Sequence, residues 1–135
     1  MIKKNIKVLL SKLGLDVHSR GVFIVAKQLR DAGMDVIYIG NSMPQQIVKA
    51  ALQEDADIIG VSSLGGAHLQ LGKELVSEAK KEGIKYNRGF VIGGVMPPDD
   101  IRELKEIGFD DVFGPGATKE EIISSIKSIF KNKLN

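Results

Sequence analysis

Apolar runs of strand length alternate along the chain with segments of helical period, and this alternation constrains the fold more than any other feature. Five such runs occur, at residues 6–10, 35–39, 57–61, 90–92 and 111–113. Each is followed by a segment whose apolar residues recur at helical spacing. After the first run these residues are Val22, Val25, Ala26 and Leu29. Apolar strands separated by helices indicate a parallel sheet that is covered on both faces.

Helix-boundary residues occur where this scheme requires them. Pro44 opens the second helical segment, at a position where a missing N–H costs nothing. Thr118 and Glu121 have the spacing of a capping box before the last segment. Three segments are followed by glycines of the kind that end helices, Gly33, Gly83 and Gly108. We therefore expect an α/β, flavodoxin-like (Rossmann-like) fold with a five-stranded parallel sheet of order 2-1-3-4-5.

The size and composition of the chain exclude several classes of protein. Its 135 residues suit a single domain, residues 1–135, and the absence of cysteine excludes disulfides, thiolate metal sites and a cysteine nucleophile. The 19 basic residues barely exceed the 17 acidic ones, and the excess lies near the termini, which argues against a nucleic-acid partner. No apolar run approaches the roughly 20 residues that span a bilayer. We expect a soluble, cytoplasmic protein without a membrane partner.

Small residues follow four of the five predicted strands. The first connection is long, residues 11–21, and ends at Gly21. The others contain Ser62-Ser63-Leu64-Gly65-Gly66, Gly93-Gly94 and Gly114-Pro115-Gly116. In an open parallel sheet, ligands bind beyond the carboxyl ends of the strands, near the point where the strand order reverses. Glycines are also common turn residues, but four such connections at one edge indicate that a bulky ligand lies close to the backbone.

Two other ligand classes fit these connections less well. A dinucleotide or a nucleoside triphosphate would require a G-x-G-x-x-G or Walker lysine pattern in the first connection, and neither is present. A phosphoacceptor receiver domain would require clustered acids at the end of the first strand, where this chain has Leu9-Leu10-Ser11. We expect neither class.

Three short motifs occur in these connections in a fixed order. Asp16-Val17-His18-Ser19-Arg20-Gly21 has the pattern D-x-H-x-x-G, Ser62-Ser63-Leu64 has the pattern S-x-L, and Gly93-Gly94 completes the set. Together they resemble the cobalamin-binding domain of coenzyme-B12-dependent mutases and of methionine synthase. The resemblance covers nearly the whole chain. It is closest to the small subunit or carboxy-terminal domain of methylmalonyl-CoA mutase and related acyl-CoA mutases, in KLGLDVHSRG, SSLGGAHL, IGGVMPPDD and FGPG.

The resemblance implies a cofactor site on these connections. It makes His18 the lower cobalt ligand of base-off adenosylcobalamin, a role that suits an imidazole nitrogen. Asp16 would accept the other ring N–H, and Lys12 would pair with Asp16. The displaced nucleotide tail would thread between the small residues. The further contacts that the resemblance implies are Arg20, Gly21, Ser62, Leu64, Gly66, Gly93, Gly94, Gly114 and Gly116.

Two other positions receive no such role. His68 matches a family position, but we interpret it as a polar residue in the first turn of a helix rather than as a ligand. Ala117 stands where the family often has threonine, with Thr118 next, which leaves a tail contact at this position open.

The resemblance also implies a partner. A radical mutase needs a barrel that encloses its substrate, and 135 residues cannot form one beside this domain. We therefore expect an isomerase whose large TIM-barrel subunit holds an acyl-CoA, with no catalytic residue on this chain and no activity of the chain alone. The alternatives are a corrinoid carrier in methyl transfer, a glutamate-mutase-like small subunit, and a cobalamin sensor or store. Carriers usually have a helical domain before the D-x-H-x-x-G motif, and sensors have an output domain.

Overall fold

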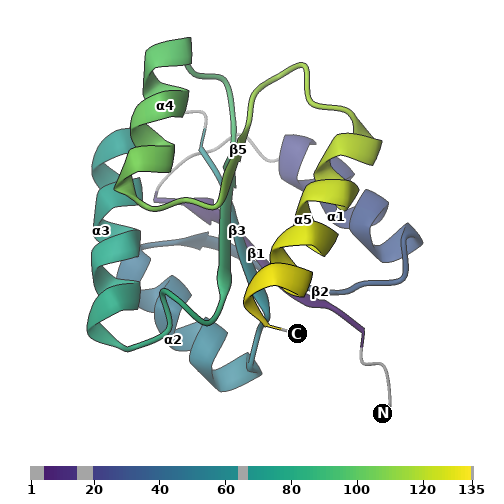
Figure 1. The fold of residues 1–135 in the computed structure, drawn as a ribbon, viewed down its shortest axis with the longest axis horizontal. Helices are drawn as coiled ribbons and strands as arrows, with labels where there is room; N and C mark the ends of the chain where they lie inside the picture. The colour runs from purple at the N-terminus through teal and green to yellow at the C-terminus, as the bar shows by residue number, and fades with distance from the viewer. Residues whose placement is uncertain (1–4, 15–19, 64–66, 135) are drawn as a thin grey trace.

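The computed structural model describes residues 5–14, 20–63 and 67–134, which alternate between strands and helices (Figure 1). The strands are β1 (Lys7–Leu13), β2 (Asp35–Ser42), β3 (Ile58–Ser62), β4 (Gly89–Gly93) and β5 (Asp111–Phe113). The helices are α1 (Arg20–Asp31), α2 (Pro44–Glu54), α3 (His68–Lys81), α4 (Pro98–Ile107) and α5 (Lys119–Lys133). None of the helices described here is long and apolar enough to cross a membrane.

All four strand pairs are parallel, and the strands lie in the order β2-β1-β3-β4-β5. The predicted flavodoxin-like order is therefore confirmed. Figure 1 shows α1 and α5 on one side of the sheet and α3 and α4 on the other. The strand order reverses between β1 and β3, so the connections after these strands begin side by side at the carboxyl edge.

Alternating side chains divide the interior into two apolar layers. The layer under α2, α3 and α4 contains Leu9, Ile59 and Ile92, which come from three neighbouring strands and are fully buried. The layer under α1 and α5 contains Leu10 and Val91, whose side chains point to the opposite face. This second layer is the one that opens toward the carboxyl edge.

The predicted helix starts are confirmed at both positions where the sequence is specific. Pro44 is the first residue of α2. At the start of α5, Thr118 Oγ1 accepts a hydrogen bond from the Glu121 backbone N–H at 3.1 Å, and Glu121 Oε1 accepts one from the Thr118 N–H at 2.8 Å. These two bonds satisfy backbone donors that the first turn of a helix leaves unpaired.

The first two strands are longer than predicted. The sequence predicts that the first connection begins at Ser11, but β1 continues to Leu13 because β2 continues to Ser42. The added residues pair across the two strands, Lys12 with Asn41 and Leu13 with Ser42. This pairing satisfies backbone groups that a loop would leave to water. The first connection is therefore shorter than expected, and Lys12 lies in a strand.

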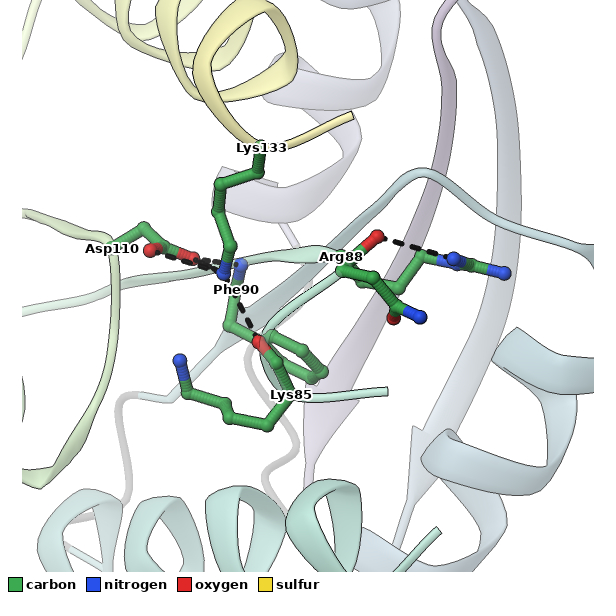
Figure 2. Close-up of polar contacts among 6 residues, drawn as sticks. Lys85, Arg88, Phe90, Asp110 and Lys133 are labelled. Atoms are coloured by element: carbon green, nitrogen blue, oxygen red, sulfur yellow. Dashed lines mark hydrogen bonds and ion pairs between the residues drawn. The ribbon is translucent and has the colours of Figure 1, made fainter. Parts of the chain in front are cut away.

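Polar contacts gather at the amino edge of the sheet, opposite the glycine-rich connections (Figure 2). Lys133, near the end of α5, donates from Nζ to the Asp110 carboxylate at 3.1 Å and to the Lys85 carbonyl at 3.0 Å. Asp110 Oδ2 also accepts a hydrogen bond from the Phe90 N–H at 2.8 Å. These contacts join the last helix to the start of β4.

Candidate functional site

A cavity of about 320 Å³ opens at the carboxyl edge, between the sheet and the two helices α1 and α5. Its lining comes from β1, β3, β4, β5, both helices and the connections that follow β4 and β5. Ser62 contributes the one polar side chain among these lining residues; the others are glycines, a proline, and aliphatic or aromatic side chains. The volume is at the lower end of what small-molecule sites have.

A larger groove, of about 750 Å³, lies against α5 and shares no lining residue with this cavity. Carboxylates and hydroxyls line it, among them Glu120, Asp111 and Ser125, and Ser125 Oγ already donates to Asp111 at 2.6 Å. The apolar cavity is the better candidate site, because it lies next to the point where the strand order reverses and several glycines converge there.

One row of paired residues crosses the sheet at the mouth of the cavity. Lys12 pairs with Ser62, Ser62 with Gly93, and Gly93 with Phe113. Alternation along β1 places Lys12 on the same face as Leu10, which lines the cavity. Three residues of the predicted cofactor site, Lys12, Ser62 and Gly93, are therefore neighbours in space, and Gly93 leaves room between Ser62 and Phe113.

A second row, Leu10, Gly60 and Val91, lies deeper in the cavity. Gly60 is in the middle of β3, and a Cβ atom there would lie 2.8 Å from Leu10 Cδ2. The missing side chain therefore makes room for Leu10 beside Gly60 in the cavity wall. Gly60 was not among the predicted site residues, although a glycine inside an apolar strand signals a close approach by another group.

Two glycines at the mouth differ in what surrounds them. Gly94 has a φ of +156°, and a Cβ atom there would overlap the Ser63 carbonyl, so the turn itself requires glycine. Gly21, the second residue of α1, also lines the cavity, but a Cβ atom there would have no neighbour within 4 Å. The described structure does not require glycine at position 21, which leaves close approach of a ligand as a physical reason for it.

The structure brings part of the predicted cofactor site together. Five predicted residues line the cavity: Gly21, Ser62, Gly93, Gly94 and Gly114. Lys12, only 6% exposed, lies in the row at the mouth. Gly116 is outside the lining, and Arg20 is the first residue of α1. The other predicted residues, Asp16, His18, Leu64 and Gly66, lie outside the described residues.

His68 makes a contact that agrees with its structural interpretation. Its ring is nearly buried at the start of α3, and Nε2 lies 2.7 Å from Asp100 Oδ2 in the first turn of α4. The contact joins the two helices on the far side of the sheet from the cavity. Within the described ranges, no three His, Asp or Glu side chains gather into a group that could hold a metal ion.

Comparison with known proteins identifies a family. A family model described as the B12 binding domain matches residues 6–124. A 2-hydroxyisobutanoyl-CoA mutase small subunit from Aquincola tertiaricarbonis is 42% identical and is matched over 92% of this chain and 91% of its own. A pivalyl-CoA mutase small subunit from Xanthobacter autotrophicus is 43% identical, over 92% and 83%. Methylmalonyl-CoA mutase of Escherichia coli is 34% identical, but this chain covers only 17% of its length.

Solved structures establish the fold independently of close sequence similarity. A cobalamin-binding protein from Desulfitobacterium hafniense superposes with a TM-score of 0.81 at 22% identity, over 93% of this chain and 60% of that one. A response-regulator receiver domain from Francisella reaches 0.73 at 17% identity, over 95% and 98%. Two different kinds of protein thus share the fold, so the fold alone does not separate them, and the residues at the carboxyl edge must do so.

Proposed function

Because this chain belongs to the B12-binding domain family, we propose that it is the cobalamin-binding small subunit of an adenosylcobalamin-dependent acyl-CoA mutase. The observation that carries the proposal is the apolar cavity at the carboxyl edge, which five residues from the sequence prediction line. The two relatives that are named small subunits of CoA mutases match over most of their length. That coverage supports a chain that acts as one cobalamin-binding domain.

The cavity suits the nucleotide tail of cobalamin, which ends in an aromatic ring. Such a ring gains free energy when it leaves water for an apolar cavity. The backbone at Gly93 and Gly94 offers close contact to a flat group, and Ser62 at the mouth offers a hydroxyl to the polar part of the tail. A phosphate group deep in the cavity would find no charged partner among the lining residues, which argues against a nucleotide bound by its phosphates.

His18 would be the lower cobalt ligand, in place of the cofactor's own base. Metal-bound histidines almost always donate their second ring N–H to a carboxylate, a backbone carbonyl or water, and Asp16, two residues earlier, would accept it. Lys12 would pair with Asp16 from the end of β1. When bound, the cofactor would supply a cobalt–carbon bond whose cleavage starts radical chemistry. This chain would bind and orient the cofactor.

The substrate site would belong to a partner, a large subunit with a TIM barrel. The two small-subunit relatives are named for different substrates, yet this chain is almost equally similar to both, at 42% and 43% identity. Similarity between small subunits therefore does not identify the substrate. We propose that the large subunit holds the acyl-CoA, that this chain is inactive alone, and that the complex works in the cytoplasm.

The decisive experiment replaces each of the two histidines of the chain in turn. The protein is loaded with cob(II)alamin, and the electron paramagnetic resonance spectrum is recorded for nitrogen splitting from the axial ligand. All the proteins carry ¹⁵N-labelled histidine, so that splitting from a protein imidazole differs from splitting by the cofactor's own base. We expect the wild type to show the ¹⁵N splitting and His18→Ala to lose it. His68→Ala, the matched control, should keep it. Persistence of the labelled splitting in His18→Ala would remove His18 from the cobalt.

A second experiment tests the partner. The chain is combined with candidate large subunits and assayed on methylmalonyl-CoA, 2-hydroxyisobutyryl-CoA and glutamate. We expect isomerisation of one acyl-CoA only when both subunits and adenosylcobalamin are present. Methyl transfer in place of isomerisation would instead identify a corrinoid carrier.

A further inference from the structure

The end of β2 holds the beginning of the connection that carries the D-x-H-x-x-G motif. We propose that Asn41 is a positioning residue: it sets the direction in which the chain leaves β1 and so places His18 for cobalt ligation. This inference rests on the proposed function, because it assigns Asn41 a part in the ligation that His18 would provide. Asn41 belongs to none of the three sequence motifs.

A β-bulge in β2 brings Asn41 into position. The pairing of β1 with β2 shifts by one residue between Leu10 and Lys12. Gly40, at this shift, has a φ of +76°, which glycine adopts without strain. Ser11 is fully buried, and its Oγ donates to the Gly40 carbonyl at 2.8 Å, so β1 itself stabilises the bulge. Bulges next to functional sites commonly re-aim a side chain. Here the residue directly after the bulge is Asn41.

Two hydrogen bonds then connect β2 to Gly14, the residue that follows β1. Asn41 Nδ2 donates to the Gly14 carbonyl at 3.1 Å. The Gly14 N–H donates to the Ser42 carbonyl at 2.9 Å. Both polar backbone groups of Gly14 are therefore held by the end of β2, one through the main chain and one through the Asn41 amide.

Gly14 is also restricted from its other side. It has a φ of +77°, and a Cβ atom there would lie 2.7 Å from Leu71 Cδ1 of α3. His18 follows four positions later in the sequence, and an extended chain advances at most about 3.6 Å per residue. The distance from Gly14 to His18 therefore cannot exceed about 14 Å. Over so short a connection, a rotation of the Gly14 peptide changes which positions the His18 imidazole can reach.

The Asn41 side chain can be changed without opening the core, because Asn41 is exposed whereas Ser11 is buried. Exposed substitutions usually change stability little. An amide can donate to the Gly14 carbonyl, but a carboxylate of the same shape cannot, since it only accepts. Replacement by alanine or by aspartate should therefore release Gly14 while the sheet stays intact.

The test uses cobinamide, a cobalamin analogue without the nucleotide tail, because its affinity depends on the axial ligand and not on occupation of the cavity. Asn41→Ala and Asn41→Asp are compared with Asn87→Ala, which is exposed at the opposite edge of the sheet. We expect both Asn41 variants to raise the Kd for cobinamide roughly two- to tenfold, the range that one net hydrogen bond supplies. Asn87→Ala should match the wild type, and the apo Asn41 variants should lose no more than a few degrees in melting temperature, the effect of one net hydrogen bond.

A spectroscopic readout separates positioning from general support of the fold. At saturating cob(II)inamide, the labelled nitrogen splitting should weaken in the Asn41 variants, which a change of stability alone does not produce. If both variants keep the wild-type Kd and splitting while His18→Ala loses the splitting, the role of Asn41 is wrong and the proposed function stands. If His18→Ala also keeps the splitting, the proposed ligation itself fails. Should Asn41→Ala fold poorly, the isosteric Asn41→Asp decides.

Discussion

At the scale of single residues, glycines at the cavity mouth serve two different purposes. Gly94 lies against the Ser63 carbonyl in a backbone conformation that residues other than glycine rarely adopt, so the turn requires glycine whether or not a ligand binds. Gly21 is the second residue of α1, where glycine is less favourable than alanine, and no described atom lies within 4 Å of the position that a Cβ atom would take. A residue that costs helix stability without a steric reason points to a ligand.

Gly21→Ala should therefore separate folding from binding. We expect the free energy of unfolding of the apo protein to stay unchanged or to rise by up to about 1 kcal/mol, because alanine favours the helix. Cobalamin affinity should fall roughly ten- to a hundredfold, the usual effect of forcing an extra methyl group into a close contact. Urea denaturation and cofactor titration measure the two quantities. Ser128→Ala, exposed on α5 and outside the cavity, is the control; equal cobalamin affinity in Gly21→Ala and wild type would contradict the close approach.

Sequence motifs located the mouth of the cavity better than its interior. Ser62, Gly93 and Gly94 were predicted because short motifs stand at strand ends, where parallel sheets bind ligands. Gly60 was missed because its effect depends on Leu10 of the neighbouring strand, and only the register reveals that contact. Asn41 was missed for the same reason, since its amide reaches Gly14 only through the bulge.

At the scale of elements, helix starts were predictable, whereas the ends of the first two strands were not. Capping is local: the Thr118 hydroxyl and the Glu121 carboxylate satisfy each other's backbone N–H within one turn. Strand length depends on a partner that the sequence does not show. β1 extends to Leu13 because β2 continues beside it, and no local signal marks that continuation.

Thr118→Ala should lower the free energy of unfolding by about 1 kcal/mol, the usual effect of removing an N-cap side chain. The loss arises because the Glu121 N–H would have only water as a partner. Thr118→Ser keeps the hydroxyl and should retain most of the stability. Chemical denaturation of the three apo proteins measures the difference, and equal stability of the alanine and serine variants would show that the capping bond contributes nothing.

At the scale of the whole molecule, the two edges of the sheet differ in chemistry. The carboxyl edge opens into an apolar cavity, whereas the amino edge is closed by charged groups around Lys85, Asp110 and Lys133 (Figure 2). Lys85 is 5% exposed, and its ammonium lies 5.6 Å from the centre of the Phe90 ring. Burial lowers the pKa of Lys85, and the nearby Lys133 lowers it further, against a smaller opposing effect of Asp110.

The stability of the protein should therefore depend on pH through Lys85. The pKa of Lys85 is lower in the folded than in the unfolded chain. Between the folded pKa and the unfolded value of about 10.4, the unfolded chain therefore holds more protons than the folded chain, and the free energy of unfolding rises with pH. Over this alkaline range, the free energy of unfolding of the wild type should rise with pH relative to that of Lys85→Met. The same comparison with Lys131→Met, an exposed lysine of α5, should show no such trend. Parallel pH profiles of wild type and Lys85→Met would refute the burial argument.

Two walls of the apolar cavity come from segments far apart in the sequence, α1 at residues 20–31 and α5 at residues 119–133. A ligand seated there would act as a reversible cross-link between these segments. Binding to the folded state alone raises the free energy of unfolding, by about 4 kcal/mol when the free ligand exceeds its Kd a thousandfold. The lifetime of such a chain in a cell would then depend on vitamin supply, with the unloaded form the first to be degraded.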